Sequence, residues 1–279
     1  MKIFRKGPQA AGAIRAWLQD MRTLSFAPES HYAVAAVLRA GLGDEGDYYF
    51  AGVNVENKEH RLSLHAEENA IAAMVAGLGP HADIRETWLM AGPQDARAAV
   101  FGEASYCGKC RQQISGFCRN ADVPMHTVGA DGSVRSSSIG SFLPGAFVLD
   151  KRNTAPEQAP DEKTVQARLQ GKSGLRSAEK FSRQPQTVTL QLSNGASVGG
   201  ARMEDAAFLS INAAQAAVGI AVAEYGQCEI ESIALHGDSL TLAAVQMLLP
   251  FAKNADIPVH HAGGDGAARV TTLRALAAV

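Results

Sequence analysis

Two kinds of hydrophobic pattern alternate along this chain. Apolar runs bounded by turn residues predict β-strands at 32–41, 47–57, 84–92 and 124–131. Apolar residues at helical spacing predict helices over HAEENAIAAMVAGL (65–78) and CGKCRQQISGFCRN (107–120). Strands that alternate with helices are typical of an α/β fold with a mixed sheet, and this is the fold class we expect.

The same pattern occurs a second time. RQQISGFCRNADVPMHTVGADG (111–132) matches VQMLLPFAKNADIPVHHAGGDG (245–266) without a gap at an offset of 134, and ten positions are identical. HAEENAIAAMVAGLG (65–79) lies over NAAQAAVGIAVAEYG (212–226) at an offset of 147. The chain is therefore expected to hold two copies of one fold.

The repeat divides the chain into four parts. The first copy occupies 25–150 and the second 186–279. Residues 151–185 contain 12 charged residues and three prolines, which predicts a linker with a short helix in its middle. Residues 1–24 precede the first copy, and AIRAWLQDM predicts a helical N-terminal extension.

Composition excludes several classes of protein. The 279 residues are 46% hydrophobic and 19% charged, with a net charge of −2, so no basic excess is present to neutralise a nucleic acid. No apolar run is long enough to cross a bilayer, and the charged N-terminus does not resemble a signal peptide. We therefore expect a cytoplasmic protein whose thiols stay reduced.

Four residues of the first copy are candidates for chemistry. His65 and Glu67 open one expected helix, and Cys107 and Cys110 open the next. One histidine and two cysteines supply the three protein ligands of a catalytic zinc site, which leaves its fourth position to water. Glu67 lies two residues beyond His65, so it leans into the same pocket without having to bind the metal.

Each of these residues also allows another interpretation. Cys107 and Cys110 could form a redox pair, and a histidine on a helix usually belongs to the core or the surface. A single glutamate in the first turn of a helix is usually solvated. The four residues together favour zinc, because the α/β order brings both helix starts to one end of the sheet.

The spacing of these residues is similar to that of a known family. HAE (65–67) followed by CGKCRQ (107–112) resembles the zinc-dependent nucleoside deaminases, specifically cytidine deaminase. FAGVNVEN (50–57) resembles the ribose-binding strand of that family, and LPGAF (143–147) the closing segment of its two-domain dimeric branch. The resemblance covers about residues 25–279 and implies a duplicated three-layer mixed-sheet fold and a homodimer.

The resemblance also implies roles for single residues. It places one zinc ion per chain on His65, Cys107 and Cys110, and makes Glu67 the proton shuttle in hydrolytic deamination of free cytidine or deoxycytidine for pyrimidine salvage. The partner would be a small nucleoside, and neither a nucleic acid nor a membrane. The implied substrate contacts are the Tyr32 ring on the base, Asn54 and Glu56 on the ribose hydroxyls, and the backbone of Ala66 and Ser105 on the polar edge of the base.

Tyr106 departs from the family pattern, which has proline just before the first cysteine. Two views of Tyr106 are open: its ring contacts the substrate and shifts the preference, or it points away and packs. The first view keeps another aminated or modified nucleoside or base open as substrate. A nucleic-acid deaminase is disfavoured by the net charge, and a non-catalytic zinc module that only binds nucleoside is disfavoured by the intact Glu67.

The second copy has lost the candidate chemistry. The residues that fall on His65, Glu67, Cys107 and Cys110 are Asn212, Ala214, Thr241 and Ala244. Glycine, proline and apolar positions persist, so we expect this half to keep the fold and to serve subunit assembly. Gly199 and Gly200 predict a close approach of backbones in this half.

Overall fold

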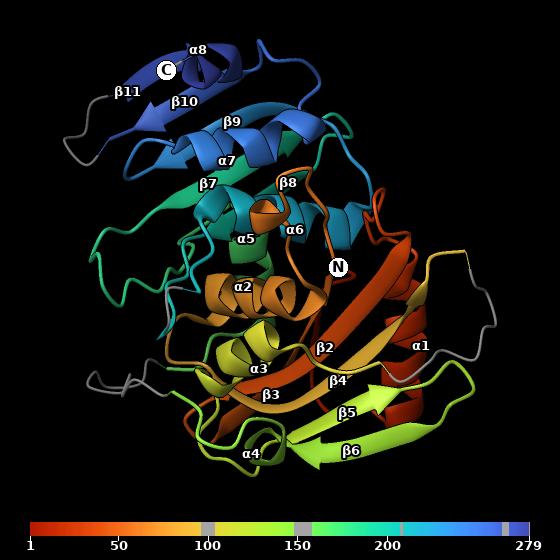
Figure 1. Cartoon of the computed structure of the whole chain (residues 1–279). Helices are drawn as coiled ribbons and strands as arrows, with labels where there is room; N and C mark the ends of the chain where they lie inside the picture. Colours follow the sequence, from red (N-terminus) through yellow and green to blue (C-terminus); the bar gives the residue numbers. More distant parts are fainter. Residues whose placement is uncertain (96–103, 148–157, 207–208, 264–267, 279) are drawn as a thin grey trace.

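The chain folds around two mixed β-sheets, which Figure 1 shows one above the other. In this computed structural model the described residues are 1–95, 104–147, 158–206, 209–263 and 268–278. The first sheet has six strands in the order β1-β3-β2-β4-β5-β6, and the second has five in the order β11-β10-β9-β7-β8. The expected α/β class with mixed sheets is confirmed.

Each half of the chain contributes one sheet with its own helices. The elements of the first half are β1 (Phe4–Lys6), α1 (Ala11–Arg22), β2 (Tyr32–Leu42), β3 (Glu45–Val53), η1 (His60–Leu62), α2 (Ala66–Leu78), β4 (Asp83–Pro93), α3 (Gly108–Ser115), β5 (Pro124–Val128), β6 (Val134–Ser138) and α4 (Ile139–Phe142). After α5 (Glu162–Leu169), the second half has β7 (Thr187–Leu192), β8 (Ser197–Ala201), α6 (Ala213–Tyr225), β9 (Ile230–His236), α7 (Leu242–Leu248), η3 (Leu249–Phe251), β10 (Pro258–Ala262), β11 (Ala268–Thr272) and α8 (Leu273–Ala277).

The two sheets share one topology. In the first, β2 pairs antiparallel with β3 and β4, and β4 runs parallel to β5 after the crossover through α3. In the second, β7 pairs antiparallel with β8 and β9, and β9 runs parallel to β10 after the crossover through α7. The order from β3 to β6 is thus repeated from β8 to β11, and β1 alone has no counterpart among the described strands.

A glycine in each half lets a helix lie directly on the sheet. A Cβ atom on Gly52 of β3 would lie 2.3 Å from the carbonyl oxygen of Ala66 in α2, and one on Gly200 of β8 would lie 2.1 Å from the backbone nitrogen of Ala217 in α6. Real side chains do not approach backbone atoms so closely. The close approach expected at Gly200 is confirmed, and it is made to a helix of the same chain.

We expect Gly52→Ala to destabilise the protein, because the new methyl group must push α2 away from β3. The free energy of unfolding should fall by about 1–3 kcal/mol or more. Gly12→Ala is the matched control, since a Cβ atom there meets nothing within 4 Å and lies in α1, where alanine is the better helix former. Urea denaturation of both variants measures the effect, and equal midpoints would contradict it.

The N-terminal segment is part of the first sheet. The expected helix is present as α1, and it buries Trp17 and Leu18. Ahead of it, β1 pairs antiparallel with β3 at the edge of the sheet, and the backbone N–H of Ile3 donates to Glu224 of α6 (3.0 Å). The sequence pattern did not reveal β1, because a strand of three residues is too short to show a period.

The segment expected to be a linker contains the expected short helix, α5. Its last part, however, repeats the loop that precedes β2. Ala178 forms an isolated bridge with Met203, as Phe26 does with Val55. Residues 176–183 therefore belong to the second copy of the fold, which starts earlier than the expected residue 186.

A carboxylate holds this loop in each half. Glu204 accepts hydrogen bonds from the backbone N–H groups of Phe181 (2.8 Å) and Ser182 (3.0 Å). Glu56 accepts from the corresponding groups of Glu29 (2.9 Å) and Ser30 (3.0 Å). The next residue has a positive φ in both loops, 53° at His31 and 55° at Arg183. These two loops therefore share their backbone geometry, although few of their side chains match.

The two halves meet through α2 and α6, which lie between the sheets (Figure 1). All residues of α2 are buried. Asn69 of α2 donates to the carbonyl oxygen of Gly219 in α6 (2.9 Å), and Gln215 of α6 donates to that of Leu62 (3.2 Å). Among the described helices, none has the length and apolar character that a membrane span requires.

Candidate functional site

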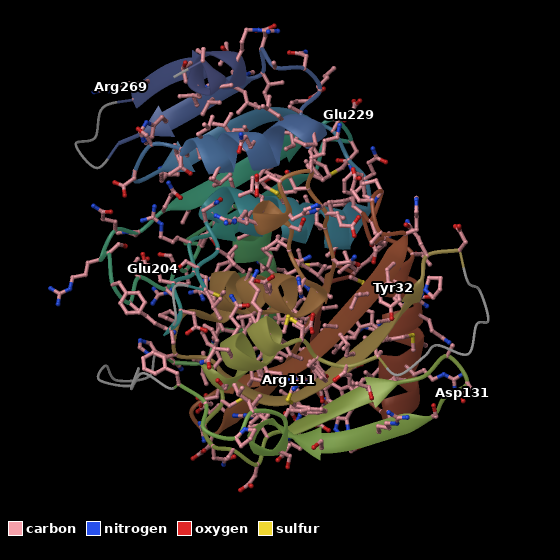
Figure 2. All side chains as sticks on the ribbon, viewed as in Figure 1. Tyr32, Arg111, Asp131, Glu204, Glu229 and Arg269 are labelled. Carbon is pink, nitrogen blue, oxygen red and sulfur yellow. The ribbon has the colours of Figure 1, made fainter. Side chains whose placement is uncertain are left out.

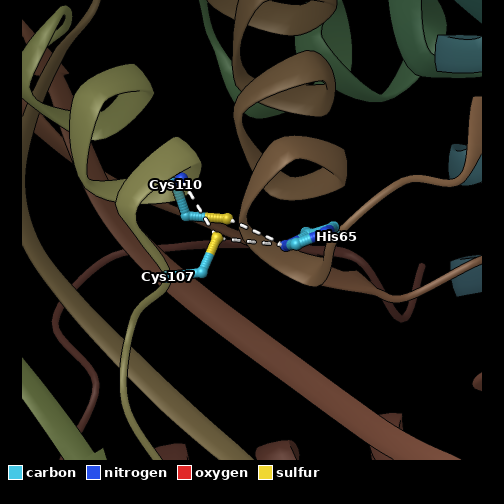
Figure 3. A group of neighbouring side chains, drawn as sticks. All are labelled: His65, Cys107 and Cys110. Atoms are coloured by element: carbon cyan, nitrogen blue, oxygen red, sulfur yellow. Dashed lines mark hydrogen bonds between the residues drawn. The ribbon is translucent and has the colours of Figure 1, made fainter. Parts of the chain in front are cut away.

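Three potential metal ligands converge where α2 and α3 begin, as Figure 3 shows. His65 occupies the N-cap position of α2, and Cys107 the N-cap position of α3. The Nδ1 atom of His65 lies 3.4 Å from Sγ of Cys107 and 3.3 Å from Sγ of Cys110. In the described part of the chain these residues form the single group of three or more metal-binding side chains.

The arrangement fits a zinc ion. Bond lengths of 2.3 Å to sulfur and about 2.0 Å to nitrogen in a tetrahedron place the sulfur and nitrogen ligands about 3.5 Å apart. The observed separations of 3.3 and 3.4 Å are close to this value. The set of one histidine and two cysteines leaves one position of the tetrahedron without a protein ligand.

A hydrogen bond between the two thiols moves their pKa values in opposite directions. Hydrogen bonds from Cys110 and from His65 lower the pKa of Cys107 to about 3, against an opposing effect of burial. The hydrogen bond to Cys107 and burial raise the pKa of Cys110, while the bond to Cys107 raises the pKa of His65. Cys107 is therefore a thiolate at neutral pH, the form in which cysteine binds metals.

Glu67 lies in the first turn of α2 beside this cluster. Its side chain is buried, and burial raises its pKa to about 7. A carboxyl group with such a pKa can both take up and release a proton near neutral pH. The role of proton shuttle expected for Glu67 stays a prediction, and the raised pKa of its carboxyl group is compatible with it.

A cavity of about 930 Å³ opens at the cluster. Two of the expected ligands, His65 and Cys107, lie on its wall together with Glu67, whereas Cys110 is buried behind it. The expected substrate contacts on the wall are Tyr32, Asn54, Glu56, Ala66 and Ser105. The structure thus brings residues from position 32 to position 105 of the sequence to one cavity.

Asn54 and Glu56 also fix the strands around the cavity. Asn54 accepts a hydrogen bond from the backbone N–H of Val34 (2.8 Å) and donates to the carbonyl oxygen of Tyr32 (2.9 Å). Glu56 holds the loop at Ser30 through the backbone bond described above. Tyr32 remains 41% exposed, so its ring is available to a ligand (Figure 2).

Comparison with known proteins agrees with this geometry. Residues 14–127 match the family model of the cytidine and deoxycytidylate deaminase zinc-binding region. Over 137 residues the chain is 30% identical to the cytidine deaminase of Sporosarcina psychrophila, and the match covers 90% of that protein and 49% of this chain. The chain belongs to the cytidine deaminase family. The expectation of a hydrolytic deaminase is thereby confirmed, and the donor set and the family model together indicate zinc.

Two further known proteins match this chain over different shares of its length. A cytidine deaminase of Shewanella amazonensis is 29% identical over 197 residues, which are 66% of this chain and 58% of that protein. The crystal structure of cytidine deaminase from Burkholderia pseudomallei is 26% identical and covers 50% of this chain and 100% of that one, with a TM-score of 0.39.

In this member of the cytidine deaminase family, Tyr106 does not face the substrate cavity. Its side chain is fully buried, and it is absent from the cavity wall. Its hydroxyl lies 2.9 Å from Oγ1 of Thr87 and donates to the carbonyl oxygen of His126 (3.0 Å). These two partners hold the phenol of Tyr106 inside the core, away from the cavity. Of the two views of Tyr106, the structure supports packing.

Two polar residues near the cluster escaped the sequence analysis of this deaminase. Lys109 of α3 forms an ion pair with the buried Glu68 of α2 (2.8 Å), which also accepts the backbone N–H of His65 (3.0 Å). The pair joins the starts of the two helices that carry the candidate ligands. Glu68 has the capping-box spacing from His65, a signal that the sequence did contain.

Arg111 fixes the backbone just before Cys107. Its guanidinium donates to the carbonyl oxygens of Tyr106 (2.6 Å) and Phe142 (3.1 Å) and to Oγ of Ser105 (3.0 Å). Arg111 itself belongs to α3 (Figure 2). The sequence offered no signal for this role, because the contacts depend on the return of the chain at α4.

The second half of this deaminase keeps the helix caps but has lost the ligands. Asn212 occupies the N-cap position of α6 and accepts the backbone N–H of Gln215 (2.9 Å). Thr241 occupies that of α7 and accepts from Ala244 (3.2 Å). The candidate ligands His65 and Cys107 thus stand at positions where an ordinary cap suffices for folding.

Proposed function

We propose that this protein hydrolyses the exocyclic amine of free cytidine and deoxycytidine, giving uridine or deoxyuridine and ammonia. The observation that carries the proposal is the convergence of three zinc ligands and the buried Glu67 at one cavity. A site that only bound a nucleoside would have no use for a buried carboxyl group whose pKa is about 7.

His65, Cys107 and Cys110 would hold one zinc ion per chain. When bound, zinc lowers the pKa of a coordinated water to about 7 and so supplies a nucleophile at neutral pH. Glu67 would carry two protons in turn. It would take the first from the attacking water and deliver it to N3 of the ring, and then take the second from the hydroxyl group formed at C4 and deliver it to the departing amine. Burial keeps the carboxyl group of Glu67 away from bulk water, so the proton it carries is available to the substrate.

The remaining wall of the cavity would bind the nucleoside. The exposed ring of Tyr32 is suited to packing on the base, and Asn54 and Glu56 would hydrogen-bond the ribose hydroxyls. The backbone groups of Ala66 and Ser105 would meet the polar edge of the pyrimidine. Ser105 is held in place by Arg111, which supports a fixed geometry at this edge.

Charge on the cavity wall favours a nucleoside over a nucleotide. Among the described residues that line the cavity, there is no lysine or arginine, and Glu29 and Glu56 contribute carboxylates. A phosphate group carries a charge of about −1.5 to −2 at neutral pH and would be repelled there. A different aminated or modified nucleoside or base is the alternative substrate.

We also propose the larger organisation that the repeat implies. The first half would be the catalytic domain and the second a degenerate domain without chemistry, which would serve the assembly of a homodimer. The four cysteines are all free. Free thiols are typical of the reducing cytoplasm, so a cytoplasmic enzyme of pyrimidine salvage stays our prediction.

The test is an assay of the purified full-length protein with cytidine, deoxycytidine, deoxycytidylate, cytosine and adenosine. Loss of ultraviolet absorbance and release of ammonia measure turnover, and a Glu67→Gln preparation controls for contaminating deaminase. We expect the highest kcat/KM with cytidine or deoxycytidine. A preference for deoxycytidylate or adenosine, or zinc-loaded protein without turnover, would contradict the proposal.

Asn54→Ala and Glu56→Ala are expected to raise KM for cytidine by about tenfold each, as one hydrogen bond to a sugar hydroxyl is lost. Both variants also lose backbone contacts, at Val34 and Tyr32 for Asn54→Ala and at Ser30 for Glu56→Ala. Glu59→Ala removes an exposed carboxylate outside the cavity and is the matched control. Unchanged KM values with the zinc content intact would show that these residues do not bind the sugar.

A further inference from the structure

Tyr106 is held by contacts on several sides. Its hydroxyl binds Thr87 on β4 (2.9 Å) and the carbonyl oxygen of His126 on β5 (3.0 Å). Its ring packs against Phe142, with the ring centroids 5.9 Å apart, and its own carbonyl oxygen accepts from Arg111 (2.6 Å). Few degrees of freedom are therefore left to this residue.

The residue that follows is the candidate ligand Cys107. Its Sγ atom lies 3.4 Å from both the backbone nitrogen of Cys110 and Nδ1 of His65. Because one peptide bond joins Tyr106 to Cys107, the anchored phenol limits where this sulfur can lie. Proline would restrict the same backbone through its ring, whereas tyrosine restricts it through side-chain contacts with two strands.

The second half of the chain provides an internal control. At the offset of 134, Tyr106 falls on Leu240, which precedes Thr241. The strand register sets Thr87 opposite Met125 and Ile233 opposite Val259, so Thr87 falls on Ile233. Both replacements are buried and apolar. The hydroxyl pair is thus absent from the half without metal ligands, although the strands and the helix are kept.

We propose that the hydroxyl of Tyr106 positions Cys107 for zinc by fastening the chain before it to β4 and β5. Tyr106 is a positioning residue, since it is absent from the cavity wall and its hydroxyl binds Thr87 and the backbone of His126. The inference rests on the proposed role of Cys107 as a zinc ligand. It assigns to this protein a hydrogen-bonded substitute for the proline of the family signature.

The experiment measures zinc transfer from the loaded full-length protein to a chromogenic chelator, well below the melting temperature. In Tyr106→Phe the ring is kept and the hydroxyl is lost, and we expect zinc to leave roughly 10-fold faster, as for other residues that orient a metal ligand. Tyr48→Phe is the matched control. Tyr48 is also buried and donates its hydroxyl to a backbone carbonyl oxygen, that of Pro160 (2.7 Å), but it does not precede a candidate ligand.

Thr87→Val gives an independent route to the same effect, because it removes the partner hydroxyl and keeps the shape of the side chain. We expect faster zinc transfer in this variant too. In the double variant with Tyr106→Phe the increase should be less than the product of the two single increases, since both changes break one interaction. Thr87→Val also carries the test if Tyr106→Phe does not fold.

The outcomes separate this inference from the proposed function. If wild-type protein holds no zinc, Cys107 is not a ligand and both proposals fail. If wild-type protein holds zinc but Tyr106→Phe and Thr87→Val release it no faster than Tyr48→Phe, the positioning role alone is overturned. Faster release in both, with melting temperatures lowered no more than in Tyr48→Phe, supports it.

Discussion

Glu67→Gln is expected to remove nearly all turnover and to leave zinc and fold intact. Glutamine has the shape of glutamate but cannot carry the proton, and general acid–base groups typically contribute about 10²–10⁴-fold to the rate. One carboxyl group would serve several proton transfers here, so we expect a loss at the upper end of this range. Measurements of kcat, zinc content and circular dichroism on the same preparation test the expectation.

The neighbouring residue supplies a matched control. Glu68 is also a buried carboxylate, but it faces Lys109 and the backbone of His65 and is absent from the cavity wall. Glu68→Gln should retain most of the turnover, because Gln215 keeps the same capping bond in the second half (3.1 Å). Equal losses in the two variants, or substantial turnover by Glu67→Gln, would argue against the proton role of Glu67.

Exchanging the three ligands for their counterparts in the second half should abolish zinc binding without unfolding the chain. The triple variant His65→Asn, Cys107→Thr, Cys110→Ala replaces ligands by residues that cap α6 and α7 or follow the cap. Asparagine and threonine are good N-cap residues, so both helices should still start at the same positions. We expect zinc to fall from one ion per chain to none, and turnover to vanish with it.

Metal analysis and thermal unfolding measure this result. The triple variant should unfold near the temperature of zinc-free wild type and below that of the loaded protein, because bound metal stabilises only the folded state. Cys228→Ala is the control: it removes a free cysteine outside the cluster and should keep one zinc. Two zinc ions in each wild-type chain, or zinc retained by the triple variant, would contradict the assignment.

The sequence predicted the α/β class with mixed sheets and the repeat of the fold, because the repeat includes residues that folding requires. The proline at the start of β5 recurs at the start of β10, and Gly52 recurs as Gly200. The second copy of the loop at 176–183 was missed for the opposite reason. It is defined by backbone hydrogen bonds to Glu204 and by a positive φ, which leave little trace in side-chain types.

Those parts of the site that depend on short spacings along the chain could be predicted from the sequence. Ligands at helix N-caps can be recognised from spacing along the chain, and His65, Cys107 and Cys110 do meet. The orientation of Tyr106 could not be read in this way, because it depends on Thr87 and on a strand that comes later in the chain. Contacts between segments far apart in the chain decide the orientation of such side chains, and a single sequence does not reveal these contacts.

The complete burial of α2 makes the two halves one folding unit. A helix that is buried on every side needs neighbours all round, and α2 obtains them from its own sheet and from α6. Cutting the chain between the halves would therefore expose α2 to solvent and favour aggregation. The second half thus shields α2 of the first from water, and heat should melt both halves in a single cooperative transition.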